Sequence, residues 1–293
     1  MDCAFEAFTP GTDTDPDPGR TFRAYRSQAT ENVSEAGRIN FGADFHLTKQ
    51  QLGKVDGDVF EILSAAAMWN AVAAWNRFMD GGAWDSTVFN CPPNAVPTPA
   101  RKVAVVKLPR NFDTTRLFKE EVRRDIEAFQ GALHARDLQL GLSSPDIVGV
   151  RLPHPLPEDC GIFLQSLPNL RNENRGLLES AHERIIGKLE GRSFLFAIAV
   201  KTSTRSDRLY QPLFEANVLK FLIGVVLRGA AFRFHVHMET FDGANVIERY
   251  KAAGLVSLLT GAEPRRAVDK VYQALQPTDT AQVILDDLPL FPL

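Results

Sequence analysis

The stretch SFLFAIAVKTSTRSDRLYQPLFEAN, residues 193–217, carries the strongest indication of the fold. Its apolar opening, residues 194–200, is rich in strand formers and bounded by polar residues, which predicts a strand buried on both faces. The strand ends on Lys201, and a polar segment with two arginines around one aspartate follows it. Pro212 marks the expected first turn of a helix that carries Glu215. A lysine, a basic segment and a carboxylate in such close succession are hard to explain by packing alone.

The composition is that of an ordinary globular chain. Of the 293 residues, 44% are hydrophobic and 24% are charged, which is enough for one large domain with a full core. The formal net charge of -3 argues mildly against a protein that coats nucleic acid. Residues 101–124 nevertheless hold eight basic residues against three acidic ones. This local excess is typical of a solvated helix face, and phosphate contact is the sharper alternative.

The cysteines and the N-terminus indicate the compartment. The 3 cysteines are widely spaced and odd in number, so they predict neither a disulfide framework nor a zinc site. The N-terminus lacks the basic-then-apolar pattern of a signal peptide, and we expect no apolar run of membrane-spanning length. A reduced, cytoplasmic, soluble protein is the expectation.

Periodicity predicts a mixed α/β sheet with helices on its faces. The predicted strands are 102–108, 146–152, 194–201 and 232–238, and the predicted helices are 55–79, 115–134, 177–189, 215–227, 255–259 and 264–275. Residues 1–39 begin with an acidic segment rich in Pro and Gly and continue with recurring arginines, so we expect a flexible N-terminal arm. Residues 40–293 are expected to form a single domain.

Carboxylates near two of these strands predict a magnesium site. Asp146 begins one buried strand and Lys201 ends another, so the two side chains converge if the strands are neighbours. Glu215 lies on the helix that follows, and Glu61 lies on the apolar face of the 55–79 helix, where a carboxylate is costly unless paired or bound to metal. Such acids suit Mg²⁺ and phosphodiester hydrolysis, in which the metal holds the scissile phosphate and activates water. Taken alone, an Asp–Lys pair is as often a structural ion pair.

Residues 205–208, the RSDR segment, have the donors and acceptors to read G·C pairs. Arginine bonds bidentately to guanine O6 and N7, and aspartate accepts from cytosine N4. Arg205, Asp207 and Arg208 therefore match two consecutive G·C pairs, and a symmetric dimer would read the palindrome CCGG. A solvated surface turn with an internal salt bridge is the alternative.

At these residues the chain resembles the CCGG-recognising type II restriction endonucleases of the PD-(D/E)xK superfamily, SgrAI most and NgoMIV more distantly. The matching stretches are 54–76, 102–113, 143–150, 199–219 and, more weakly, 263–272. The resemblance implies a restriction-endonuclease-like α/β core, with a central mixed β-sheet flanked by helices. It also implies a homodimer or higher oligomer that cuts double-stranded DNA with Mg²⁺, just 5′ of CCGG, and leaves four-base 5′ overhangs.

The resemblance implies catalytic roles for four residues. Asp146 and Lys201 match the catalytic Asp and Lys, and Glu61 matches the additional active-site glutamate. Ala199 stands where the superfamily's general motif has an acid. The CCGG family moves that acid to the following helix, where Glu215 stands at the matching spacing as the second metal-binding carboxylate beside Asp146.

The resemblance also implies the residues that contact DNA bases. Arg205, Asp207 and Arg208 match the residues that read the CCGG core. Lys54 aligns with a lysine that contacts the flanking degenerate base pair in the SgrAI-like enzymes.

Three alternatives stay open at the level of sequence. One is a PD-(D/E)xK nuclease with relaxed or different specificity, and another is a sequence-specific DNA-binding protein without catalysis. The third concerns His235 and His237, which alternate on a predicted strand and could bind zinc. No third ligand is evident for them, so a solvated strand face is favoured.

Overall fold

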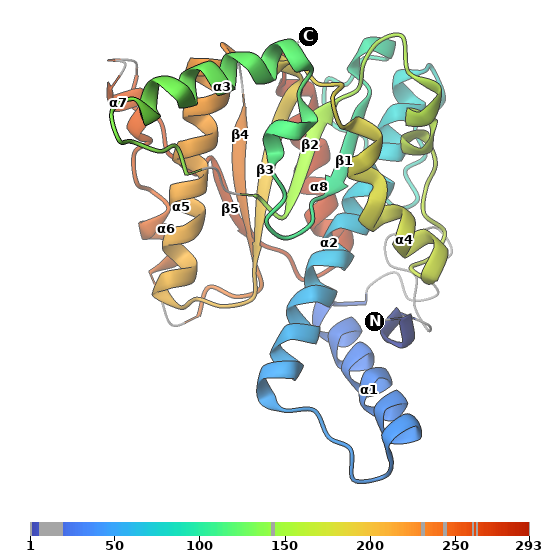
Figure 1. Cartoon of the computed structure of the whole chain (residues 1–293). Coiled ribbons are helices and arrows are strands. Elements are labelled where there is room, and N and C mark those ends of the chain that lie inside the picture. Colours follow the sequence, from blue (N-terminus) through green and yellow to red (C-terminus); the bar gives the residue numbers. More distant parts are fainter. Residues whose placement is uncertain are drawn as a thin grey trace.

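The computed structural model describes residues 2–5, 20–141, 144–229, 232–242, 245–259, 261 and 263–292. In this part of the chain, a mixed five-stranded sheet carries helices on both faces (Figure 1). Its strands, in spatial order, are β1 (Val103–Lys107), β2 (Ile147–Arg151), β3 (Phe194–Lys201), β4 (Arg233–Met238) and β5 (Lys270–Gln273). The pairs β1–β2 and β2–β3 are antiparallel, whereas β3–β4 and β4–β5 are parallel. The predicted α/β class is confirmed.

The helices divide between the two faces of the sheet. They are α1 (Phe22–Phe41), α2 (Lys49–Met79), α3 (Glu120–His134), α4 (Asn172–Ser180), α5 (Ser206–Phe221), α6 (Val246–Arg249), α7 (Leu255–Leu259) and α8 (Pro277–Asp287). Figure 1 shows α2 and α8 on one face and α3 and α5 on the other, with α1 and the start of α2 projecting as a helical hairpin. The interior of the molecule is therefore one layered core with the sheet at its centre.

Helix α2 fixes the position of the sheet. A capping box between Thr48 and Gln51 starts it, and its Ala-rich middle is buried. Asn76 accepts from the main-chain N–H of Val103 at 2.8 Å and donates to the oxygens of Val103 at 2.7 Å and Phe163 at 2.9 Å. Because α2 is bonded in this way to the start of β1, its earlier turns lie along the other end of that strand.

Sheet register brings the predicted catalytic strands together. Ile147 of β2 pairs with Lys107 of β1 on one side and with Ile198 of β3 on the other. Gly149 is required in β2 because a Cβ there would collide with the ring of Phe196. The end of β1, the start of β2 and the end of β3 thus share one edge of the sheet.

Two element predictions are wrong. Residues 264–275 do not form a helix: they contain β5, which gains parallel pairing with β4, and the helix α8 follows it. Pro212 is not in the first turn of its helix, because α5 begins at Ser206 and holds Pro212 inside it. The RSDR segment is accordingly the N-terminal turn of α5 and not a free loop.

Other boundaries shift. Residues 177–189 were expected as one helix, but α4 ends at Ser180 and a 3₁₀ turn, Ala181–Ile185, follows it. Residues 22–41, most of which we assigned to a flexible arm, form α1, whose Phe22 and Tyr25 are buried in the common core. The division of the chain at residue 40 stays a prediction. One described helical stretch, Arg208–Val226, is long and apolar enough to span a membrane by length and composition, contrary to the expectation, and 44% of its most apolar window is buried against the rest of the molecule.

Candidate active site

Asp146 and Lys201 meet at the shared edge of β2 and β3. Oδ2 of Asp146 accepts from the main-chain N–H of Val200 at 2.7 Å and from Nζ of Lys201 at 3.4 Å. The main-chain oxygen of Asp146 accepts from Leu108 N at 2.9 Å. The carboxylate is therefore held by the main chain of β3, while the main chain of Asp146 is held by the residue after β1. The predicted convergence of Asp146 and Lys201 is found in the structure. Lys201 is buried, with 9% of its surface exposed.

Glu61 of α2 faces the same edge of the sheet. Its Oε1 lies 2.8 Å from Nζ of Lys107, the last residue of β1, and both side chains are largely buried. Burial and the negative charge of Asp146 raise the pKa of Glu61, and the ammonium of Lys107 opposes that rise. Glu61 and Asp146 are therefore close enough to interact as like charges, with one lysine beside each.

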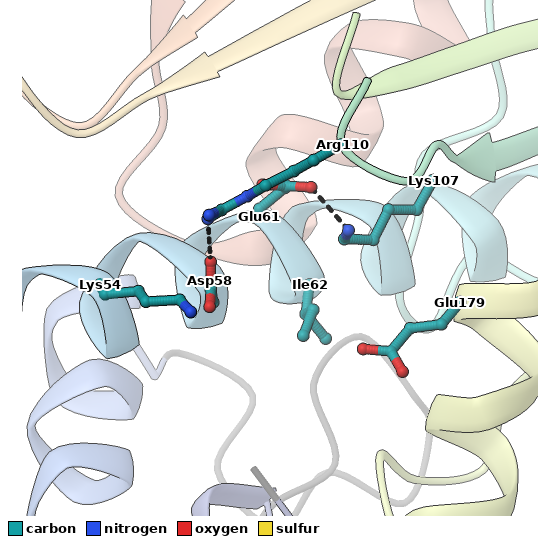
Figure 2. A pocket seen from close by; sticks show the side chains of 7 residues that line it. All are labelled: Lys54, Asp58, Glu61, Ile62, Lys107, Arg110 and Glu179. Atoms are coloured by element: carbon teal, nitrogen blue, oxygen red, sulfur yellow. Dashed lines mark hydrogen bonds and ion pairs between the residues drawn. The ribbon is translucent and has the colours of Figure 1, made fainter. Parts of the chain in front are cut away.

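A cavity of about 260 Å³ opens beside Glu61. Three cationic and three carboxylate side chains line it (Figure 2). Its lining residues are Lys54, Asp58, Glu61, Ile62, Lys107, Arg110 and Glu179. Arg110, whose side chain is 71% exposed, pairs with Asp58 at 2.7 Å. The structure thus places Lys54, predicted to contact the flanking base pair, on the same cavity as Glu61.

Glu215 is buried on α5 but is not joined to Asp146 by any described contact. Its Oε1 accepts from Nε2 of Gln211, one turn earlier, at 2.8 Å. Its charge also acts on Tyr250, whose pKa is raised mainly by burial and then by Glu215. The role of Glu215 as the second metal-binding carboxylate stays a prediction. Ala199 is fully buried and supplies no acid on β3.

The RSDR segment forms the start of α5. Arg205 is the N-cap residue, and its main-chain oxygen accepts from the N–H groups of Arg208 and Leu209. The side chains of Arg205 and Arg208 are exposed, whereas the side chain of Asp207 lies outside the described residues. The β3–α5 connection passes α2, where a Cβ on Gly57 would lie 4.0 Å from Oγ1 of Thr202. Two of the three predicted base-reading residues thus lie at the molecular surface.

The histidines of β4 are not on a solvated strand face, and that prediction is wrong. His235 and His237 are 1% and 0% exposed. His237 Nδ1 lies 3.2 Å from the hydroxyls of Ser64 and Thr280. Burial lowers the pKa of each histidine to about 3. These side chains are polar parts of the core, between the sheet and the helices α2 and α8.

Sequence reasoning missed Lys107 and Gln211. Lys107 closes a buried strand just as Lys201 does, and that shared position was the available signal. Gln211 carries no pattern of its own, because its importance follows only from its bond to Glu215.

The donor set fits a magnesium ion. Asp146 and Glu61 offer carboxylate oxygens, and Mg²⁺ is commonly held by one or two carboxylates with waters and substrate phosphates completing its shell. Within the described ranges, no three His, Cys, Asp or Glu side chains gather as a ready metal cage. The arrangement therefore suits a cation that shares its ligands with a bound phosphate.

A mixed sheet that presents an Asp and a Lys at adjoining strand ends, beneath an α-helical acid, defines a restriction-endonuclease-like fold. The crystal structure of type IIF restriction endonuclease Bse634I with cognate DNA superposes with a TM-score of 0.76, over 97% of this chain and 89% of that one, at 19% identity. A second Bse634I structure gives a TM-score of 0.75 with the same coverage, at 18% identity. At these identities the superpositions establish the fold.

The family model of the Cfr10I/Bse634I restriction endonucleases matches residues 19–288. The chain belongs to this family and is a type II restriction endonuclease, a site-specific deoxyribonuclease. Among curated proteins, none matches the chain significantly. The expectation of a type II restriction endonuclease is confirmed, while the likeness to SgrAI and NgoMIV stays a prediction.

Proposed function

We propose that the chain cuts double-stranded DNA with Mg²⁺ at a palindrome centred on CCGG. It would cut just 5′ of CCGG on each strand and leave four-base 5′ overhangs. The observation that carries the proposal is the pairing of Asp146 with Lys201 at the end of β3, followed at once by the RSDR segment with its exposed Arg205 and Arg208. Cutting and base reading are then served by one continuous piece of chain.

Each active-site residue has a definite task in this proposal. When bound, Mg²⁺ supplies Lewis-acid activation of water and of the scissile phosphate. Asp146, fixed by the N–H of Val200, would hold the ion, with Glu61 and Glu215 as further carboxylates. Lys201 is placed 3.4 Å from Asp146, where its ammonium would stabilise the negative charge that develops on the phosphate.

Base reading would come from Arg205, Asp207 and Arg208. Each arginine would bond bidentately to a guanine, and the aspartate would accept from the cytosines. A palindromic site requires a twofold-symmetric reader, so the active species would be a homodimer or a higher oligomer. Lys54, on the cavity beside Glu61, would contact the flanking base pair. Bse634I has been solved with its cognate DNA, and we extend DNA binding to this chain, acting in the cytoplasm.

Two further candidates predict different behaviour. A nuclease of the same fold with relaxed specificity would cut without requiring CCGG. A DNA-binding protein without catalysis would bind a site in Mg²⁺ and leave it intact. The geometry around Asp146 and Lys201 favours DNA cleavage over DNA binding without catalysis. It also favours a catalytic role for this pair over a purely structural one, because Glu61 adds a second acid at the same place.

Digestion of plasmid DNA tests the proposal. The purified chain with Mg²⁺ is expected to give discrete fragments whose ends map to CCGG. The variant Asp146→Asn is expected to bind a CCGG duplex in Ca²⁺ and not to cut it in Mg²⁺. Random nicking, absence of cutting by the unaltered chain, or full cutting by the variant would contradict the proposal.

A further inference from the structure

Lys107 is a charged residue at the active-site edge, the edge of the sheet where β1 ends, β2 begins and β3 ends. It has no task in the reaction just proposed. It ends β1 and pairs across the sheet with Ile147, the residue after Asp146. The next residue, Leu108, donates its N–H to the main-chain oxygen of Asp146 at 2.9 Å. Lys107 is therefore fixed beside the catalytic aspartate by the same main-chain bonds that position Asp146 itself.

The ammonium of Lys107 forms an ion pair with the carboxylate of Glu61. Nζ and Oε1 are 2.8 Å apart, with the two side chains 16% and 17% exposed. Figure 2 shows the two side chains pointing toward one another from β1 and α2. At this burial the pair is poorly screened by solvent, so its attraction holds the Glu61 carboxylate in one place.

Each acid of the active-site edge thus has its own lysine. Asp146 is 3.4 Å from Lys201, and Glu61 is 2.8 Å from Lys107. The carboxylates of Asp146 and Glu61 and the ammonium groups of Lys201 and Lys107 sum to zero charge without metal, to which Glu215, the third carboxylate proposed for the metal, adds one negative charge. A divalent cation entering such a set meets the field of two lysines, which offsets much of the attraction of the two acids.

We propose that Lys107 is the resident counter-ion of Glu61. Lys107 holds the Glu61 carboxylate opposite Asp146 and makes firm metal binding depend on the arrival of a DNA phosphate. Lys107 is a positioning residue, since it acts through Glu61. The negative charge of the phosphate restores the attraction for the metal that the two lysines offset. Metal and DNA therefore bind cooperatively. This inference rests on the proposed function, because it assumes that Asp146 and Glu61 hold the metal.

Titration of the DNA-free protein with Mn²⁺ at pH 8, by calorimetry, tests the inference. Lys107→Met is expected to bind Mn²⁺ about tenfold more tightly than the unaltered chain, because one nearby positive charge is gone. Lys107→Gln, which keeps a hydrogen-bond donor and serves if the Met variant does not fold, is expected to do the same. Lys107→Arg is expected to match the unaltered chain.

Two controls separate this effect from general changes in charge or stability. Lys102→Met removes a lysine of similar burial that pairs with Asp80 at 2.6 Å just before β1, and its Mn²⁺ affinity is expected to be unchanged. Adding Glu61→Gln to Lys107→Met is expected to abolish the gain, because the gain acts through Glu61. Equal or weaker Mn²⁺ binding by both neutral variants, including no detectable binding by any form, would overturn the inference.

DNA gives the complementary measurement. The ratio of Mn²⁺ affinities with and without a CCGG duplex is expected to shrink about tenfold in Lys107→Met. An unchanged ratio would overturn the inference while leaving the proposed function intact, provided that the unaltered chain and Lys102→Met still cut at CCGG. Failure of the unaltered chain to cut would instead count against the proposed function.

Discussion

The sheet carries two Asp–Lys pairs that are built alike but lie at opposite edges. Asp146 precedes β2 and accepts from the N–H of Val200 at 2.7 Å, with Lys201 at 3.4 Å. Asp269 precedes β5 and accepts from the N–H of Phe234 in β4, also at 2.7 Å, and Nζ of Lys220 lies 2.8 Å from its carboxylate. In both pairs, an aspartate at the start of one strand is fixed by the main chain of its neighbour.

The surroundings of the two pairs differ. Lys220, the partner of Asp269, also donates to the main-chain oxygen of Arg266 at 2.9 Å, so it ties α5 to the segment before β5. The pair of Asp146 and Lys201 instead faces a further acid, Glu61, and is followed in the chain by the exposed start of α5. An Asp–Lys pair at a sheet edge can thus serve a structural role alone. It becomes a candidate catalytic centre through a neighbouring acid and an open path to substrate.

Replacing the two aspartates by asparagine gives the largest expected difference. Asp146→Asn keeps an oxygen to accept from Val200 but loses the charge that would hold the proposed metal. It is expected to lower the cleavage rate by roughly a thousandfold, since a bound metal ion supplies several kcal/mol of transition-state stabilisation. Asp269→Asn is expected to cut within about twofold of the unaltered chain. Single-turnover cleavage of a CCGG duplex measures both, and equal losses would show that the pairs do not differ in function.

Arginines near the two pairs give the next largest expected difference. Arg205→Ala and Arg208→Ala are each expected to weaken binding to a CCGG duplex by about 1–3 kcal/mol and to relax selectivity for its bases. Arg265→Ala removes an exposed arginine near Asp269 and is expected to leave selectivity unchanged. Competition binding against duplexes with single base changes distinguishes these outcomes. A loss that is uniform over all sequences would mean that the two arginines contact phosphates only.

The buried histidines of β4 predict an acid-sensitive core. Both have a folded-state pKa of about 3, below the unfolded value of 6.5, so the folded state favours the neutral ring. Their contribution to stability is complete above pH 6.5 and is lost as pH falls from 6.5 toward 3. At pH 5, each is expected to lower the free energy of unfolding by about 2 kcal/mol.

Urea unfolding at several pH values measures this contribution. The slope of the free energy of unfolding against pH is expected to be shallower in His237→Gln than in the unaltered chain. An identical slope between pH 6.5 and 4.5 would contradict the burial of a neutral His237.

The smallest expected difference between the two pairs is in their contribution to the free energy of unfolding. Asp269→Asn is expected to lower the free energy of unfolding by about 1 kcal/mol, because it breaks a partly exposed ion pair but keeps the hydrogen bond to Phe234. Asp146→Asn is expected to lower it less, since it also relieves repulsion with Glu61. Urea unfolding at pH 8 compares the two variants. A larger loss for Asp146→Asn would indicate that its pair is the more structural one.

The sequence predicts four strands of the sheet because β1, β2 and β3 are local apolar runs with a polar last residue and β4 alternates polar and apolar residues. It does not predict β5, since the four residues 270–273 become a strand only through parallel pairing with β4. Pro212 misled the placement of α5, because a helix that starts at Ser206 tolerates the loss of one main-chain donor.

The candidate site is predictable where main-chain register decides it. Asp146 lies just before the start of β2 and Lys201 ends the antiparallel neighbour β3, and their convergence follows from that. The pairing of Glu61 with Lys107 depends on how α2 crosses β1, which no local pattern records. The burial of His235 and His237 likewise depends on the cover that α2, α8 and the first residues of α1 provide over β4.

Sequencing the cut ends of a randomised duplex library tests the central claim most directly. The library is incubated with the purified chain and Mg²⁺, and both strands of every product are read. Products are expected to carry four-base 5′ overhangs of sequence CCGG, and Asp146→Asn is expected to yield none while Asp269→Asn yields the same ends as the unaltered chain. Ends without a common CCGG, or cleavage that survives Asp146→Asn, would contradict the account.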